Sequence, residues 1–251
     1  MERWQGRVAV VTGASAGIGE AIARALVKSG LKVVGMARRV EKMEAIAKDL
    51  VGEAGQMFAV QCDVADESSV IAAFKTVEET HGGADVLVNN AGVAYRNTLL
   101  DGSVESWTKI MAVNVIGLSH CTKLAIESMM RRGVDDGHII HISSVAAHVV
   151  PSSAEIHFYA ASKHAVRALT EGLRHELRDK KSHIKITSIS PGLVKSDIYE
   201  ACMGQRVSDM VYSTLPYLEA DDVADSVISV LSSKPSVQVH EMIIKPFGEA
   251  Y

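Results

Sequence analysis

Tyr159 and Lys163 are four residues apart in a stretch with helical spacing, so both side chains share one face of the predicted helix. Free tyrosine has a pKa of about 10, so ionising it to the phenolate at neutral pH costs about 4 kcal/mol. An ammonium about 4 Å from the phenolate, at an effective dielectric constant of about 20, stabilises the phenolate by about 4 kcal/mol. Pairs with this spacing are most often accidents of a helix surface. If the pair is functional, we expect Tyr159 to give a proton to a carbonyl oxygen or to take one from an alcohol.

Polar residues that suit the same chemistry lie upstream. Ser143 and Ser144 end a strand-like run, where a hydroxyl can hold a substrate oxygen and polarise a carbonyl. Capping of the loop after that strand is the alternative role for both serines. Asn114 lies inside an apolar helical stretch, where an amide costs free energy unless its hydrogen bonds are satisfied. A structural kink is the alternative to a catalytic role for Asn114.

A glycine-rich turn between the first strand-like run and its helix indicates a phosphate site. The turn reads Thr12-Gly13-Ala14-Ser15-Ala16-Gly17-Ile18-Gly19. Where side chains are missing the backbone can approach a phosphate, and the free N–H groups of the helix N-terminus carry a partial positive charge. In a dinucleotide-binding fold the pyrophosphate binds at this first turn. A turn that needs glycine only for its positive φ is the alternative.

The end of the second strand-like run predicts which dinucleotide binds. An NAD site carries an acidic residue about 20 residues beyond the glycine turn, and no acid stands there. Arg38 and Arg39 stand there instead, and guanidinium groups offer paired donors to a 2′-phosphate. We expect NADP(H), with Arg38 as the main phosphate ligand and Arg39 in support. The alternative is that both arginines merely begin the next helix.

The elements that must position these residues alternate along the chain. Short β-branched runs predict strands at residues 8–12, 32–36, 57–62, 86–89, 138–142, 184–189 and 241–244. Helical spacing predicts helices at residues 20–29, 41–50, 67–80, 159–179 and 220–231, and around 107–130. Strands that alternate with helices form a mainly parallel sheet with helices on both faces. We therefore expect a single α/β domain over residues 1–251.

Four sequence motifs, in their order along nearly the whole chain, resemble the characteristic motifs of the short-chain dehydrogenase/reductase family. They are Thr12-Gly-x-x-x-Gly-x-Gly19, Asn89-Asn90-Ala91-Gly92, Tyr159-x-x-x-Lys163 and Pro191-Gly192. The resemblance implies a Rossmann-type, doubly wound parallel sheet with the strand order 3-2-1-4-5-6-7, and the strand prediction above also has seven members. It further implies an oxidoreductase that moves a hydride between NADP(H) and the carbon of an alcohol or carbonyl.

The same resemblance implies a catalytic set, which consists of Asn114, Ser144, Tyr159 and Lys163. Tyr159 exchanges the proton and Ser144 holds the substrate oxygen. Asn114 anchors a water that links Lys163 to solvent. The segment between the serines and Tyr159 is longer than in many members of the family, which leaves Ser143 open as an alternative to Ser144.

The resemblance also implies how the cofactor is held. Asp63 accepts the adenine amino group with the Val64 backbone, although a turn or helix-start role for Asp63 is the alternative. Asn90 is structural or lies near the adenosine ribose. Val194 meets the nicotinamide amide through its backbone and Ser196 through its hydroxyl. The expected cofactor-binding residues are Gly13, Ser15, Gly17, Ile18, Gly19, Arg38, Arg39, Asp63, Val64, Asn90, Ala91, Gly92, Tyr159, Lys163, Pro191, Gly192, Val194 and Ser196.

The segment after Gly192 is expected to cover the substrate. Residues 193–218 are apolar but not cleanly periodic, and members of the family use this region as a lid. An apolar lid favours a lipophilic substrate, whereas ordinary helix packing is the alternative. Within the family the sequence most resembles insect farnesol-dehydrogenase-like and vertebrate cytosolic members. A farnesol-like isoprenoid, a steroid or another carbonyl compound is therefore expected.

Composition excludes several other classes. A formal net charge of -4 lacks the basic excess of a nucleic-acid-binding protein. The 3 cysteines have no CxxC spacing, which indicates a reduced, cytoplasmic protein, and no His/Cys set has zinc-ligand spacing, so no metal is expected. No apolar run approaches the about 18 residues of a membrane span. Members of the family commonly form homodimers or homotetramers, and we expect the same here.

Two other functions compete with this interpretation. One is a catalytically silent, cofactor-binding regulatory protein on the same fold, which the intact set of Asn114, Ser144, Tyr159 and Lys163 argues against. The other is a non-redox or sugar-nucleotide enzyme. The short C-terminal part leaves little room for the substrate domain that such enzymes carry.

Overall fold

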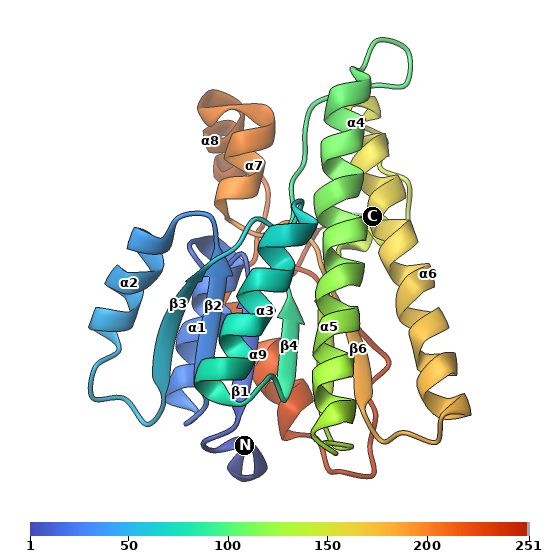
Figure 1. Ribbon diagram of the computed structural model, residues 1–251. Coiled ribbons are helices and arrows are strands. Elements are labelled where there is room, and N and C mark those ends of the chain that lie inside the picture. Colours follow the sequence, from blue (N-terminus) through green and yellow to red (C-terminus); the bar gives the residue numbers. More distant parts are fainter. Residues whose placement is uncertain (250–251) are drawn as a thin grey trace.

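A sheet of seven parallel strands forms the centre of the computed structural model, which describes residues 1–249 apart from the side chain of Ala154 (Figure 1). The strand order is β3-β2-β1-β4-β5-β6-β7, which confirms the predicted Rossmann-type topology. The strands are β1 (Val8–Thr12), β2 (Lys32–Ala37), β3 (Gln56–Gln61), β4 (Val86–Asn89), β5 (His138–Ile142), β6 (Lys185–Pro191) and β7 (Glu241–Ile244). Residues 250 and 251 of the expected domain lie outside the described residues.

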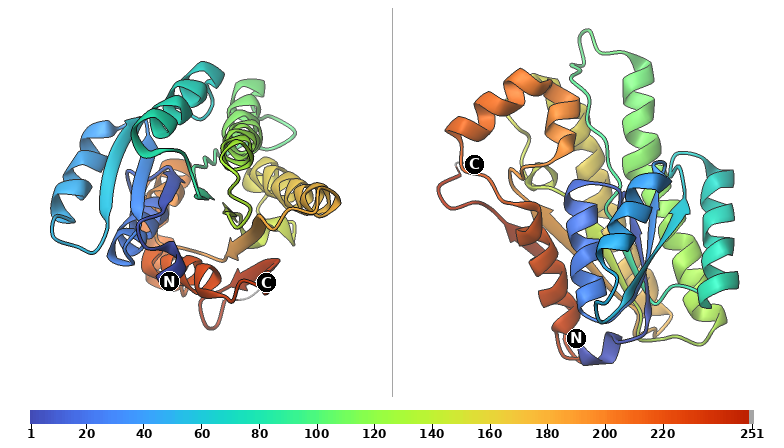
Figure 2. Two further views of the ribbon diagram at one scale, coloured as in Figure 1. Left: turned by 60° about the horizontal axis from the view of Figure 1, so that its bottom comes forward. Right: turned by 90° about the vertical axis from the view of Figure 1, so that its left-hand side faces the viewer.

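Helices cover both faces of this sheet (Figure 2). They are α1 (Gly17–Lys28), α2 (Val40–Asp49), α3 (Glu67–His81), α4 (Val104–Met111), α5 (Leu118–Arg131), α6 (His157–Asp179), α7 (Asp197–Met203), α8 (Gln205–Thr214) and α9 (Ala220–Ser232). Strand β1 is buried along its whole length. Ala9 and Val11 pack into the core on one face, and Val8 and Val10 pack into the core on the other. Burial on two faces explains why the strands read as continuous β-branched runs.

The topology brings separate parts of the chain to one edge of the sheet. Because the strands are parallel, their carboxyl ends lie at the same edge. After β3 the chain crosses to β4 on the other side of β1, and this reversal of strand order opens a crevice beside β1. The turns that follow β1, β4, β5 and β6 therefore meet around that crevice.

The helical stretch predicted around residues 107–130 is interrupted. Between α4 and α5 lies a π-helical segment, Ala112–Gly117, which contains Asn114. A Cβ at Gly117 would lie 2.3 Å from the Val64 carbonyl oxygen, so this residue lets the segment approach the chain after β3 closely. The structure thus has a helix irregularity at Asn114, and π-segments of this kind are frequent at functional sites.

Residues 193–218, the expected lid, contain two short helices. Figure 1 shows α7 and α8 above the carboxyl edge of the sheet. No residue of α7 is buried, and Ser208 is the single buried residue of α8. These helices lack a buried stripe, which explains why the sequence shows no clean period there. Within residues 1–249, no helix combines the length and apolar character that crossing a membrane requires.

Two histidines of β5 lie inside the protein. His138 is fully buried, with Nε2 2.9 Å from the Thr187 hydroxyl oxygen, and His141 is buried nearby. Burial, with a smaller contribution from the charge of Lys185, lowers the pKa of His138 to about 3. Burial, with the charge of Lys163, lowers the pKa of His141 to about 3. Both rings are therefore neutral at physiological pH.

We expect acid to destabilise the fold through these histidines. An unfolded histidine titrates at about 6.5, so between this value and the folded pKa the unfolded chain binds protons that the folded chain does not. The free energy of unfolding therefore falls as pH falls, by about 1.4 kcal/mol per histidine between about pH 7.5 and about pH 5.5. Urea unfolding at both pH values measures the loss. His138→Gln, which retains a donor for Thr187, should reduce the loss by about 1.4 kcal/mol. An unchanged loss would contradict a neutral, buried His138.

Candidate active site

Tyr159 and Lys163 lie on one face of α6, at the carboxyl end of β5. Lys163 is 5% exposed, and its Nζ donates a hydrogen bond to the Ile142 carbonyl oxygen at 3.0 Å. The same Nζ lies 5.6 Å from the centroid of the Tyr159 ring. The spacing of the two residues thus brings a buried ammonium beside the phenol, as predicted.

The electrostatics of this pair differ from the expectation. Burial raises the pKa of Tyr159 to about 12, although its interaction with the Ser144 hydroxyl acts in the opposite direction. Burial lowers the pKa of Lys163 to about 8. The expected fall in the tyrosine pKa is therefore absent, because the cost of removing a phenolate from water exceeds the stabilisation that its neighbours provide. At neutral pH the chain alone holds Tyr159 protonated and Lys163 charged.

The structure brings Ser144, rather than Ser143, to Tyr159. The Ser144 hydroxyl acts on the Tyr159 phenol and also caps the short 3-10 helix Val145–Ala147, accepting from the Ala146 N–H at 3.1 Å. Ser143 is buried directly after β5, and its N–H donates to the Ile189 carbonyl of β6 at 2.7 Å. Its hydroxyl has no partner among the described residues. Ser144 thus combines the capping role with a place beside the phenol.

Asn114 joins the segment after β4 to the first turns of α6. Its Oδ1 accepts from the Val93 N–H at 2.8 Å, and its Nδ2 donates to the Val93 carbonyl at 2.9 Å and to the Ser162 hydroxyl at 3.1 Å. The amide is therefore satisfied, as its burial requires. A Cβ at Gly92 would lie 3.6 Å from Asn114 Oδ1 and 4.0 Å from Lys163 Nζ. Asn114 and Lys163 thus both lie beside Gly92.

The glycine turn has the backbone geometry that a phosphate cradle needs. Gly13 and Gly17 have φ angles of 70° and 55°, which side chains disfavour. A Cβ at Gly19 would lie 2.3 Å from the Gly13 carbonyl oxygen and 2.4 Å from Asn90 Nδ2. Helix α1 begins with Gly17 and Ile18, and no side chain caps this start. Its first N–H groups are thus available to an anion such as a pyrophosphate.

Thr12 connects the glycine turn to β4 and was not among the predicted site residues. Its hydroxyl oxygen accepts from the N–H groups of Asn90 at 3.1 Å and Ala91 at 3.0 Å. The Asn90 side chain in return donates to the Thr12 carbonyl at 2.9 Å. Asn90 therefore has a structural role, which was one of the two roles that the sequence analysis expected for it. The position of Thr12 as the first residue of the glycine motif is the sequence feature from which this role could have been predicted.

The two arginines after β2 lie beside the glycine turn. Both Arg38 and Arg39 are exposed, and Arg39 Nη2 donates to the Ser15 hydroxyl at 3.2 Å. Ala37, which ends β2, is 8% exposed and is followed directly by these two cations. Arg39, expected in a supporting role, is thus the arginine that contacts the turn.

Asp63 forms a turn directly after β3. Its Oδ1 accepts from the Ala65 N–H at 3.0 Å, and its own N–H donates to the Ser69 hydroxyl at 2.9 Å. Asp66, rather than Asp63, caps α3 by accepting from Ser68 and Ser69. Asp63 therefore stabilises a turn, which was the alternative role given for it in the sequence analysis. Val64 follows Asp63 and contacts the π-helical segment through its carbonyl.

The segment after β6 passes over the glycine turn. Pro191 ends β6, and the Gly192 N–H donates to the Ile244 carbonyl at 2.8 Å. Val194 forms a parallel bridge with Leu218 at the base of the lid. The Ser196 Cβ lies 3.5 Å from the place that a Cβ at Gly17 would occupy. The predicted pyrophosphate and nicotinamide segments are therefore direct neighbours.

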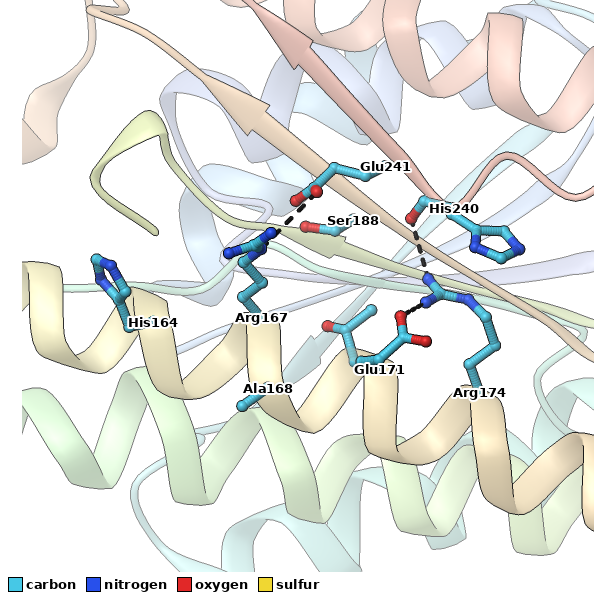
Figure 3. A pocket seen from close by; sticks show the side chains of 9 residues that line it. His164, Arg167, Ala168, Glu171, Arg174, Ser188, His240 and Glu241 are labelled. Carbon is cyan, nitrogen blue, oxygen red and sulfur yellow. Dashed lines mark hydrogen bonds and ion pairs between the residues drawn. The ribbon is translucent and has the colours of Figure 1, made fainter. Parts of the chain in front are cut away.

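A surface pocket of about 480 Å³ lies apart from these residues, between α6 and the β6–β7 edge of the sheet (Figure 3). None of the predicted site residues line it. Its charges are paired, with Arg167 3.8 Å from Glu241 and with Arg174 against Glu171. This pocket is thus separate from the crevice that holds Tyr159 and the glycine turn.

Comparison with known proteins agrees with this geometry. Residues 7–205 match a family described as "short chain dehydrogenase". Dehydrogenase/reductase SDR family member 11 of Bos taurus is 47% identical over 250 residues, which are 98% of this chain and 98% of that protein. Farnesol dehydrogenase of Aedes aegypti is 46% identical over 253 residues, which are 100% of both chains.

A solved structure shows the same architecture. The alcohol dehydrogenase of the archaeon Thermococcus sibiricus, complexed with 5-hydroxy-NADP, is 30% identical and has a TM-score of 0.85. The match covers 98% of this chain and 99% of that one. Fold, motif order and relatives agree, and the chain belongs to the short-chain dehydrogenase/reductase family of oxidoreductases.

Proposed function

We propose that this oxidoreductase uses NADP(H) to interconvert a lipophilic alcohol and its carbonyl. The observation that carries the proposal is the cluster at the end of β5. There the half-buried Tyr159 meets the Ser144 hydroxyl and the buried Lys163 ammonium. This cluster shares its sheet edge with the glycine turn, so a bound dinucleotide would lie within reach of the proton donor.

The chain's own residues supply the proton chemistry, and the bound nicotinamide supplies or accepts the hydride. In the direction of reduction, Tyr159 holds its proton at neutral pH because its pKa is raised to about 12. It donates this proton to the substrate oxygen while the Ser144 hydroxyl donates a hydrogen bond to the same atom. The charge of Lys163, whose pKa is about 8, stabilises the phenolate that results. Proton return to Tyr159 would pass by Lys163 and Asn114, which both lie beside Gly92.

The glycine turn and the arginines beside it would hold the cofactor. Gly13 and Gly19 let the turn pack closely against Asn90, and the uncapped start of α1 at Gly17 would bind the pyrophosphate. Arg38 and Arg39 are placed to bind a 2′-phosphate, which favours NADP(H) over NAD(H). The solved relative that is complexed with an NADP analogue supports the same choice.

Residues 193–218 would form a lid with an apolar lining. Ile198, Cys202 and Met203 of α7 are half-buried, although α7 contributes no residue to the core. Tyr212 lies 5.7 Å from the ring centroid of Tyr199. Such a surface suits an apolar ligand, and the 46% identity to a farnesol dehydrogenase makes farnesol the first substrate to test. The cytoplasmic location and the homodimeric or homotetrameric state stay predictions from the sequence.

We expect Tyr159→Phe to lower kcat by at least about 100-fold, because positioned acids and bases contribute about 10² to 10⁴ in rate. The assay follows the absorbance of reduced nicotinamide with farnesol and NADP⁺, and with a panel of steroid and quinone carbonyls and NADPH. Fluorescence titration with NADPH is the control, and affinity should change little because the ring is kept. Unchanged turnover in this variant would refute the proton-transfer role. Tight NADPH binding without turnover in the wild type would favour the regulatory alternative.

The pH profile should report Lys163. Its ammonium, with a pKa of about 8, is charged below this pH and loses its charge above it. The value of kcat/KM for NADPH, which reflects groups of the cofactor-free enzyme, should therefore be constant up to about pH 8 and fall at higher pH. A profile that stays flat to about pH 10 would contradict a functional charge on Lys163 with this pKa.

Single substitutions test the phosphate site. Arg38→Ala and Arg39→Ala remove donors that are worth about 1.5–3 kcal/mol when they bond to a charged group, so KM for NADPH should rise by about 10- to 150-fold. KM for NADH should not change, because NADH lacks the 2′-phosphate. Arg178→Ala is the matched control, since this arginine is 69% exposed at the far end of α6. An enzyme that prefers NADH and is insensitive to both substitutions would exclude this site.

A further inference from the structure

The pocket between α6 and the β6–β7 edge is lined by charged and polar side chains (Figure 3). Helix α6 supplies Arg167, Glu171 and Arg174, which lie on one face because residues three and four apart are neighbours on a helix. Strand β6 supplies Ser188, and strand β7 supplies Glu241. The volume of about 480 Å³ falls within the range of pockets that hold small organic molecules.

One carbonyl oxygen holds Arg174 and Ser188 next to each other. The His240 carbonyl accepts from Arg174 Nη2 at 3.1 Å and from the Ser188 N–H at 3.1 Å. Arg174 Nη1 also forms an ion pair with the Glu171 carboxylate. The Arg174 side chain is only 10% exposed, so these bonds fix its guanidinium against the residue that precedes β7.

Two polar groups at this point lack a hydrogen-bond partner within residues 1–249. They are Arg174 Nε and the Ser188 hydroxyl, and Ser188 is 2% exposed. Buried polar groups are hydrogen-bonded in the great majority of cases, so two neighbouring exceptions indicate a missing partner. A guanidinium can donate but not accept, and a hydroxyl can do both. The partner that satisfies both groups is therefore an acceptor.

Arg167 adds further donors to the same pocket, two helical turns before Arg174. Its Nε lies 3.8 Å from the Glu241 carboxylate, which is beyond hydrogen-bond distance, and its guanidinium has no hydrogen bond to a residue that the structure describes. Ser188 and Glu241 are paired in the register of β6 and β7. Their side chains therefore stand side by side opposite Arg167, and the unused donors face one space.

The two carboxylates of the pocket do not depend on the arginines alone. Glu241 lies 3.0 Å from His148 Nε2, and Glu171 lies 3.1 Å from His175 Nε2. Neither histidine lines the pocket. Each carboxylate thus keeps a partner outside the pocket when an arginine turns toward a ligand.

We propose that this pocket binds an oxyanion, namely the carboxylate or phosphate group of a small organic molecule. Arg167, the Arg174 Nε–H and the Ser188 hydroxyl donate to its oxygens, because guanidinium groups match the geometry of both anions. None of the residues of the proposed active site lines the pocket, so the inference is independent of the proposed function.

Isothermal titration calorimetry at constant ionic strength tests the site with two probes, citrate for the carboxylate and inorganic phosphate for the phosphate. We expect saturable binding of one probe molecule per chain, and the probe that binds identifies the group. Titrations with and without NADPH separate this pocket from the glycine turn, since binding here should not compete with the dinucleotide. Absence of saturable binding by both probes, or displacement of the probe by NADPH, would overturn the proposal.

Two substitutions locate the bound probe. Arg167→Gln and Ser188→Ala each remove a hydrogen bond to a charged group, so each should raise Kd by about 10- to 150-fold. Arg167 is 53% exposed, and its substitution therefore spares the core. Arg178→Gln is the matched control on the same helix and should leave Kd unchanged. An unchanged Kd in the first two variants, or an equal rise in Arg178→Gln, would refute the assignment to this pocket.

A second copy of the chain is the competing occupant of this face. Light scattering of wild type and Arg167→Gln distinguishes the two cases. The proposal expects the same oligomeric mass for both proteins, together with weaker binding of the probe by the variant. A lower mass for Arg167→Gln, with no probe bound by the wild type, would show instead that the pocket is closed by a partner subunit.

Discussion

The burial of one ammonium group, that of Lys163, is the constraint on which the site depends. A buried charge is costly, and the lowered pKa of Lys163 reflects this cost. The Ile142 carbonyl at the end of β5 offers an acceptor, so the start of α6 must lie over that strand. This placement sets Tyr159 one turn before Lys163 and beside Ser144, which follows β5. The position of the charge therefore determines the position of the proton donor.

Most of the fold could be predicted from the sequence because the sheet is buried on both faces. Strands β1, β4 and β5 have the predicted bounds, since continuous buried apolar runs end where polar or glycine residues begin. The partly exposed edge strand β7 also has its predicted bounds. The π-helical segment Ala112–Gly117 was not predicted, and a kink at Asn114 was only the alternative to a catalytic role, because the hydrophobic period of this segment hardly differs from that of the helices beside it. The lid helices were not predicted, since their apolar residues are half-buried and follow no single stripe.

The composition of the site was easier to predict than its electrostatics. The residues of the motifs meet at one sheet edge because the order of parallel strands leaves them no other place. The choice between Ser143 and Ser144 needed the structure, since both follow β5 where the strand alternation no longer applies, and the spacing to Tyr159 is unusual. The structure was also needed to predict the direction in which the pKa of Tyr159 shifts. Sequence spacing identifies the nearby cation, whereas the burial that outweighs it depends on packing from distant segments.

The shallow packing of α7 and α8 has a consequence for how such an enzyme diversifies. Substitutions at surface positions usually change stability by less than about 0.5 kcal/mol, and these helices bury Ser208 alone. Their residues can therefore drift or be randomised with little risk to folding, whereas α6, which carries Lys163 and the proposed proton donor Tyr159, and the fully buried strand β5 tolerate far less. On the proposed function, selectivity and reactivity would thus depend on parts of the chain with different mutational tolerance. A library confined to residues 197–214 would explore new ligands on an intact reaction centre.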